Sequence, residues 1–144
     1  MNKVIIYTDG GSRGNPGPAA IGIVFCNQKN QIIKKYSQKL NKTTNNVAEY
    51  EAVIFALQKF KALFGKKLAK STEIELRSDS DLLIKQLNGR YKILDSKIQP
   101  LFLEVWNLKF DFKKVKFKFI SRKKNKEADS LVNEALDSST KQLI

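Results

Sequence analysis

The sequence contains no histidine and only one cysteine, Cys26, among its 144 residues. The absence of histidine excludes Ser-His-Asp and Cys-His catalytic triads, zinc sites with imidazole ligands and a histidine general base. A single cysteine cannot form an internal disulfide or a cysteine-rich metal cage. If the protein is an enzyme, its chemistry must therefore come from carboxylates, lysines, hydroxyls or a metal ion held by oxygen ligands.

Long apolar segments are absent as well. No apolar run approaches the roughly 20 residues that a membrane-spanning helix requires. The first 14 residues lack the apolar stretch of a secretory signal peptide. We therefore expect a cytoplasmic protein with no membrane partner. Its length fits one domain, residues 1–144, which we expect to be monomeric.

Acidic residues are scarce relative to basic ones. The chain has 27 Lys and Arg against 14 Asp and Glu, which gives a formal net charge of +13. A field of this sign attracts polyanions such as nucleic acids. In the most basic stretch, Lys114, Lys116 and Lys118 alternate with apolar residues. These three lysines are either phosphate contacts or the solvated face of a strand whose charges discourage edge pairing.

Local sequence patterns predict an α/β domain. Four glycines and two prolines at 10–18 predict a long loop after the first strand. Three strands come first and the later strands are joined through helices, so we expect an antiparallel part followed by a parallel part. The predicted strands cover 3–8, 19–26, 31–40, 72–77 and 114–120, and the predicted helices cover 47–64, 80–87, 98–110 and 126–136.

Four of the few acidic residues lie at strand ends or along helix edges. Asp9 and Asp79 each follow a predicted strand, while Glu49 and Asp129 each border the apolar face of a predicted helix. Taken singly, each has a structural interpretation. Asp9 fits a turn, and Glu49 fits a capping box with Asn46. Asp79 fits a helix N-cap, and Asp129 fits a helix start, where the dipole favours an acid.

Taken together, the four acids predict a site for divalent metal ions. If the strands that carry Asp9 and Asp79 are neighbours, both carboxylates leave the same edge of the sheet. Clustered carboxylates repel one another and do not all stay ionised unless cations are present. Oxygen ligands without cysteine or histidine select Mg²⁺ or Mn²⁺. In a strongly basic chain, such a site indicates phosphate-ester chemistry.

The residues around these acids resemble the signature motifs of the type 1 ribonuclease H family. The resemblance runs from about Val4 to Ala135, with four motifs in the family's order. It implies an α/β, ribonuclease H-like fold: a five-stranded mixed sheet, its first three strands antiparallel, flanked by helices. The motifs are Tyr7-Thr8-Asp9-Gly10-Gly11-Ser12-Arg13-Gly14-Asn15-Pro16-Gly17, Thr43-Thr44-Asn45-Asn46-Val47-Ala48-Glu49, Arg77-Ser78-Asp79-Ser80 and Asn125-Lys126-Glu127-Ala128-Asp129.

The resemblance also implies an activity, namely endonucleolytic hydrolysis of the RNA strand of RNA–DNA hybrids to give 5′-phosphate and 3′-hydroxyl ends. It implies two Mg²⁺ ions, with Mn²⁺ as a substitute. Asp9 would bridge both ions, Glu49 and Asp79 would hold one, and Asp129 would complete the other. All four acids are therefore expected to be metal ligands and catalytic residues. Other RNA duplexes are a further candidate substrate.

By the same resemblance, a second group of residues contacts the substrate. Amide side chains both donate and accept hydrogen bonds, which suits contacts in the minor groove. The asparagines at the start of the predicted helix also fit helix capping, and both roles can hold. The expected contacts are Asn15, Asn45 and Asn46 in the minor groove, Thr44 at a DNA phosphate, and the backbone of Gly10, Gly11 and Ser12 along the RNA.

The chain departs from the family's pattern in the loop before the last helix. Many members carry a histidine there, and Arg122 is its nearest counterpart here. Arginine does not act as a base at neutral pH, so Arg122 either attracts the cleaved phosphate or is a solvated cation. The sequence also shows neither a separate hybrid-binding domain nor the basic protrusion of some members. The strong positive charge and the absent histidine keep open a non-catalytic alternative, a protein that binds RNA–DNA hybrid or double-stranded RNA on the same fold.

Overall fold

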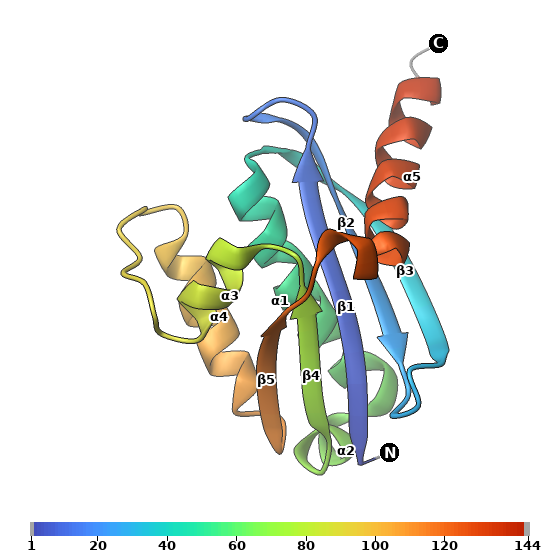
Figure 1. Ribbon diagram of the computed structural model, residues 1–144, viewed down its shortest axis with the longest axis vertical. Coiled ribbons are helices and arrows are strands. Elements are labelled where there is room, and N and C mark those ends of the chain that lie inside the picture. The colour runs from blue at the N-terminus through green and yellow to red at the C-terminus, as the bar shows by residue number, and fades with distance from the viewer. Residues whose placement is uncertain (1, 143–144) are drawn as a thin grey trace.

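Five strands form one mixed sheet (Figure 1). They are β1 Lys3–Ser12, β2 Gly17–Cys26, β3 Ile32–Thr43, β4 Glu73–Ser78 and β5 Lys114–Phe119. Their order across the sheet is β3-β2-β1-β4-β5. The first three are antiparallel, whereas β4 runs parallel to β1, and β5 parallel to β4. The predicted topology is therefore confirmed. The computed structural model describes the backbone of residues 2–142 and the side chains as far as residue 138.

Helices cover both faces of the sheet (Figure 1). They are α1 Asn45–Phe64, α2 Lys66–Lys70, α3 Asp81–Leu87, α4 Gln99–Lys109 and α5 Lys126–Gln142, with a 3₁₀ turn, η1, at Arg122–Lys124. α1 packs on one face along β1 and β2, where Tyr50, Leu57 and Phe60 are fully buried. α5 packs on the other face, over β1, β2 and β3. None of the helices in the described part of the chain has the length and apolarity needed to cross a membrane.

The glycine-rich segment differs most from its prediction. A long loop at 10–18 is wrong, because β1 continues to Ser12 and β2 begins at Gly17. Pairing between the two strands extends as far as Ser12 opposite Ala19, so only residues 13–16 connect them. The sequence patterns also miss α2 and η1, because so few residues show no periodicity.

Two glycines in the strands allow the two long helices to approach the sheet. A Cβ atom on Gly10 of β1 would lie 2.3 Å from the carbonyl carbon of Ala48 in α1. A Cβ atom on Gly22 of β2 would lie 2.3 Å from the carbonyl oxygen of Ala128 in α5. Real Cβ atoms do not come this close to backbone. Glycine at these positions therefore sets how near α1 and α5 lie to the sheet.

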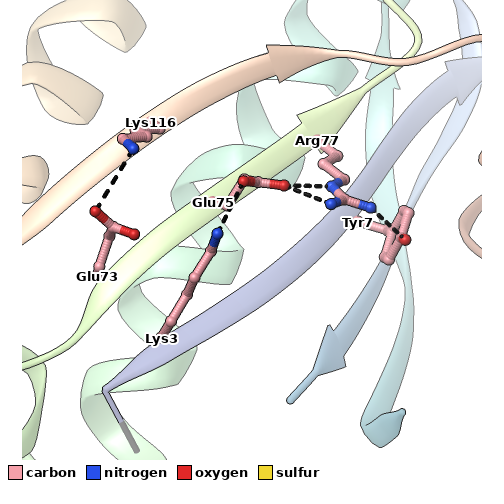
Figure 2. Close-up of polar contacts among 6 residues, drawn as sticks. All are labelled: Lys3, Tyr7, Glu73, Glu75, Arg77 and Lys116. Atoms are coloured by element: carbon pink, nitrogen blue, oxygen red, sulfur yellow. Dashed lines mark hydrogen bonds and ion pairs between the residues drawn. The ribbon is translucent and has the colours of Figure 1, made fainter. Parts of the chain in front are cut away.

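A charged network on the sheet face opposite α1 aligns β1 with β4 (Figure 2). Glu75 of β4 lies between Lys3, whose Nζ is 3.2 Å from Oε1, and Arg77, whose guanidinium donates to Oε2. Arg77 also donates to the Oη of Tyr7 at 2.8 Å. Tyr7 and Arg77 are register partners in the parallel pair. Asp9 and Asp79 each lie two residues beyond this pair, so they reach the same edge of the sheet.

The lysines of β5 lie along the same region of the sheet. Lys116 pairs with Glu73 of β4, with 3.7 Å between Nζ and Oε1 (Figure 2). β5 is an edge strand, and lysines on such strands discourage pairing with other chains. For Lys116 these observations favour the solvated strand face over a phosphate contact.

Gly10→Ala is expected to destabilise the protein by about 2–3 kcal/mol, because the new Cβ meets helix backbone that cannot move aside cheaply. Free energies of unfolding from urea denaturation measure the effect. Gly11→Ala is the matched control for stability, since its Cβ would lie 3.6 Å from Cγ1 of Val132, an ordinary contact. Equal losses of stability in the two variants would contradict the explanation that Gly10 is needed for the close approach of α1.

The pKa of Glu75 lies below its ordinary value of 4.5, because burial opposes ionisation but the hydrogen bonds and charges of Arg77 and Lys3 outweigh burial. The ionised carboxylate therefore stabilises the fold above pH 4.5, and this contribution is lost as the pH falls through the lowered folded pKa. Glu75→Gln is expected to lower the free energy of unfolding by about 1–2 kcal/mol at about pH 7. The difference in the free energy of unfolding between the variant and the wild type should become small at about pH 3. Urea denaturation at both values tests this, and a difference that is independent of pH would count against it.

Candidate active site

Three carboxylates from three elements converge at one edge of the sheet. Asp9 lies in β1, Glu49 in α1, and Asp79 directly follows β4. One carboxylate oxygen of each lies within 4.8 Å of the others. Asp9 and Glu49 are only 8% and 9% exposed, and Asp79 is half-buried. The structure therefore brings together three of the four acids that the sequence singles out.

Strand pairing and helix capping leave the two aspartates available for a ligand. Asp9 is paired with Gly22 inside the sheet, so the interpretation as a turn residue is wrong. α3 is capped by Ser80, whose hydroxyl accepts the backbone N–H of Leu83 at 3.2 Å. The N-cap interpretation of Asp79 is therefore wrong as well.

Glu49 is held by β1 and not by the start of its own helix. Its Oε1 accepts the backbone N–H of Gly10 at 2.7 Å. The side chain of Thr44 caps α1 by accepting the N–H of Val47 at 3.3 Å, so the predicted capping box between Asn46 and Glu49 is wrong. The hydrogen bond to Gly10 points the carboxylate at the end of β1.

Asp129 joins the cluster from the other face of the sheet. It lies in the first turn of α5 and lines a hollow of about 520 Å³ that the other three acids also line. Its charge disfavours the ionised forms of Asp9 and Asp79. The close approach of α5 at Gly22 brings it there. All four acids therefore face one hollow.

Burial and mutual repulsion favour the protonated forms of the acids. Desolvation, followed by the charges of neighbouring acids, raises the pKa of Asp9 from 3.8 to about 7. Burial, followed by the charge of Asp9, raises the pKa of Glu49 well above 4.5. Burial also raises the pKa of Asp79, although a hydrogen bond from Asn125 and the charge of Arg122 oppose it. A bound cation would relieve this repulsion.

The donor set fits a hard divalent cation. Asp9, Glu49 and Asp79 offer only carboxylate oxygens, which Mg²⁺ and Mn²⁺ prefer over softer ligands. A cation at this point would also stabilise the ionised forms of Asp9 and Glu49, which burial and the neighbouring acids disfavour. The chemistry of the ligands and the electrostatics of the site therefore agree on a divalent-metal centre.

Most of the remaining predicted contact residues surround the same hollow. Asn45 Oδ1 accepts the backbone N–H of Ser12 at 2.8 Å and so ties the end of β1 to the start of α1. Asn15 Oδ1 accepts the N–H of Asn45 at 3.0 Å. The structure thus shows scaffold contacts for Asn15 and Thr44, and their contacts with substrate stay predictions. Six predicted residues line the hollow: Gly10, Gly11, Ser12, Asn45, Asn46 and Arg122.

Sequence reasoning missed three polar residues around the site. Arg13 lines the hollow and pairs with Asp137 of α5 at 2.6 Å. Asn133 also lines it, and its Nδ2 is 3.5 Å from Oδ2 of Asp129. The spacing of four residues places Asn133 and Asp129 on one helix face, a signal that the sequence does contain. Asn125 is almost fully buried beside the acids; it opens the fourth motif of the resemblance, but the sequence alone assigns it no role.

Comparisons with known proteins agree with this geometry. A family model described as reverse transcriptase-like matches residues 7–135. The chain is 35% identical to a ribonuclease H of Clostridium botulinum, over 95% of this chain and 97% of that protein. It is also 35% identical to a bifunctional protein of Mycobacterium tuberculosis, over 94% of this chain and 36% of that protein. The structure of LC11 RNase H1, isolated from compost, matches with a TM-score of 0.91 and 45% identity, over 97% of this chain and 99% of that one.

The order of the strands and the acids at the edge of the sheet define the ribonuclease H-like class of proteins. Within that class, similarity in sequence and structure extends over nearly the whole chain. The chain belongs to the type 1 ribonuclease H family. It spans about a third of the length of the mycobacterial relatives that it matches, 36% of each.

Asp9→Asn is expected to stabilise the metal-free protein at alkaline pH. The folded pKa of about 7 exceeds the unfolded value, so the folded state binds the proton more tightly and stability falls as the pH rises from about 4 to 7. Asparagine does not titrate. The variant should therefore exceed the wild type by about 2–4 kcal/mol at about pH 8 and approach it near pH 4. Urea denaturation in EDTA measures both free energies of unfolding, and a variant less stable than the wild type at pH 8 would refute the argument that burial and neighbouring acids disfavour the ionised form of Asp9.

Proposed function

We propose that the protein is an endoribonuclease that hydrolyses the RNA strand of RNA–DNA hybrids. The convergence of four carboxylates on one hollow carries this proposal. A net charge of +13 attracts a polyanion. The hollow itself is lined by four acids, which would repel phosphate groups. Bound cations would neutralise these acids and let a phosphate enter. A relative supports the choice of substrate, because LC11 RNase H1 in complex with an RNA/DNA hybrid matches this chain with a TM-score of 0.90 and 43% identity.

We assign two Mg²⁺ ions to the site, with Mn²⁺ as a substitute. Asp9 would contact both ions, Glu49 and Asp79 would hold one, and Asp129 would complete the other. When bound, the ions would activate the attacking water and stabilise the charge on the leaving 3′-oxygen. The protein then needs no side-chain base, which accords with a sequence that lacks histidine.

Residues at the rim of the hollow would read the hybrid. Telling RNA from DNA requires hydrogen bonds to the 2′-hydroxyl, and the exposed amides of Asn45 and Asn46 can supply them. The backbone of Gly10 and Gly11 would lie along the RNA. Of the two interpretations of Arg122, its place in the lining of the hollow beside Asp79 supports attraction of the cleaved phosphate.

The proposal predicts cleavage of one strand only. Purified protein with Mg²⁺ or Mn²⁺ should shorten the RNA of a hybrid and leave the DNA intact, with 5′-phosphates on the products. Labelling each strand in turn and resolving the products on denaturing gels measures this. Asp9→Asn should reduce the cleavage rate at least about a thousandfold while hybrid binding persists, because the bridging carboxylate is lost.

Asp95→Asn serves as the matched control, because this exposed aspartate lies outside the acidic cluster. Its cleavage rate should equal that of the wild type. A hybrid that is bound in a gel-shift experiment but left uncut by the wild type would overturn the enzymatic assignment and favour the non-catalytic binder.

A further inference from the structure

Asn125 is a buried residue that contacts Asp79, Asp129 and Thr8, the residue before Asp9. It is 1% exposed and immediately precedes α5. Its Nδ2 donates to the carbonyl oxygen of Thr8, the residue before Asp9, at 2.9 Å. Its own carbonyl accepts the backbone N–H of Asp129 at 3.1 Å. Its side-chain amide also faces Asp79. One residue thus joins β1, the end of β4 and the start of α5.

The orientation of the Asn125 amide does not serve the helix that follows it. At the position before a helix, an asparagine side-chain oxygen ordinarily accepts an N–H of the first turn. Within the described part of the chain, Asn125 Oδ1 has no hydrogen-bond partner, although it is buried. A buried acceptor without a partner is costly. The flipped amide would set oxygen against the Thr8 carbonyl, so the contact with β1 determines the orientation.

We propose that Asn125 is a positioning residue that holds Asp9, Asp79 and Asp129 together for binding of a divalent cation. This inference rests on the proposed function, because it concerns the same site. Without a cation the carboxylates repel one another, so their spacing must come from uncharged contacts. The Asn125 side chain supplies such contacts to β1 and to Asp79 while adding no charge, and its backbone carbonyl holds the first turn of α5.

Asn125→Ser separates positioning from stability. Serine is a strong N-cap residue, so it can bond to the first turn of α5 while losing the reach to Thr8. The free energy of unfolding should stay close to that of the wild type. Mn²⁺ affinity, measured by calorimetry with the metal alone, should fall about tenfold, as is typical when a residue that orients ligands is removed. On the hybrid, kcat should fall about tenfold while KM changes less than twofold.

A second variant and a control complete the experiment. Asn125→Asp keeps the shape and the capping ability but sets a carboxylate oxygen against the Thr8 carbonyl, so Mn²⁺ affinity should again fall. Asn88→Ala is the matched control: Asn88 Nδ2 donates to the carbonyl of Phe117 at 3.1 Å, remote from the acids. This control should lose stability and keep the Mn²⁺ affinity of the wild type.

Unchanged Mn²⁺ affinity in both Asn125 variants would overturn the positioning role, as would a loss of stability without a loss of affinity. The Mn²⁺ readout does not depend on cleavage. If the wild type binds Mn²⁺ but leaves the hybrid uncut, the proposed function fails, and a lower affinity in the variants still supports the role of Asn125.

Discussion

Mutual repulsion among four carboxyl groups is the constraint on which the rest of the structure depends. Oxygens of three of them lie within 4.8 Å of one another, and like charges this close cost free energy. The fold supplies what holds them. The register of β1 and β4 brings two aspartates to one edge, and close approaches at Gly10 and Gly22 admit the helices that carry Glu49 and Asp129. Each acid is thus fixed by the backbone of its element.

Burial alone does not distinguish a site carboxylate from a structural one in this sheet. Asp9, Glu49 and Glu75 are exposed to nearly the same small extent, 8%, 9% and 9%. The pKa of Glu75 is nevertheless lowered, because Arg77 and Lys3 flank it, whereas those of Asp9 and Glu49 are raised by burial and neighbouring acids. Among the described residues, Glu75 thus has two cationic neighbours where Asp9 and Glu49 have other acids, and this difference supports the proposed metal site.

The sequence allowed the topology and the four acids to be predicted, because strand alternation and helical spacing record which face each residue buries. It did not allow the local role of Glu49 to be predicted. A capping box fits its spacing, but the actual partner is the Gly10 N–H, 39 residues away. The strand through Gly10 was missed for a similar reason, since glycine is typical of loops and its close approach to α1 is visible only in the folded chain. Gly17 instead packs against the carbonyl oxygens of Arg13 and Gly14 in the turn before β2. The role of Asn125 could not be predicted either, because its partner Thr8 lies 117 residues away in the sequence.

The asparagines near the site use the side-chain oxygen for the scaffold, which leaves the side-chain nitrogen for the substrate contacts proposed above. Asn15 and Asn45 each use the side-chain oxygen to accept a backbone N–H. For the described residues, neither side-chain nitrogen has a protein partner. Each nitrogen is a donor with two hydrogens, and a nucleic acid presents many acceptor oxygens in its sugars and phosphates. Because the side-chain oxygens of Asn15 and Asn45 are held by the backbone, their side-chain nitrogens have fixed positions at the surface. This arrangement makes helix-start geometry compatible with the substrate contacts proposed above for the same residues.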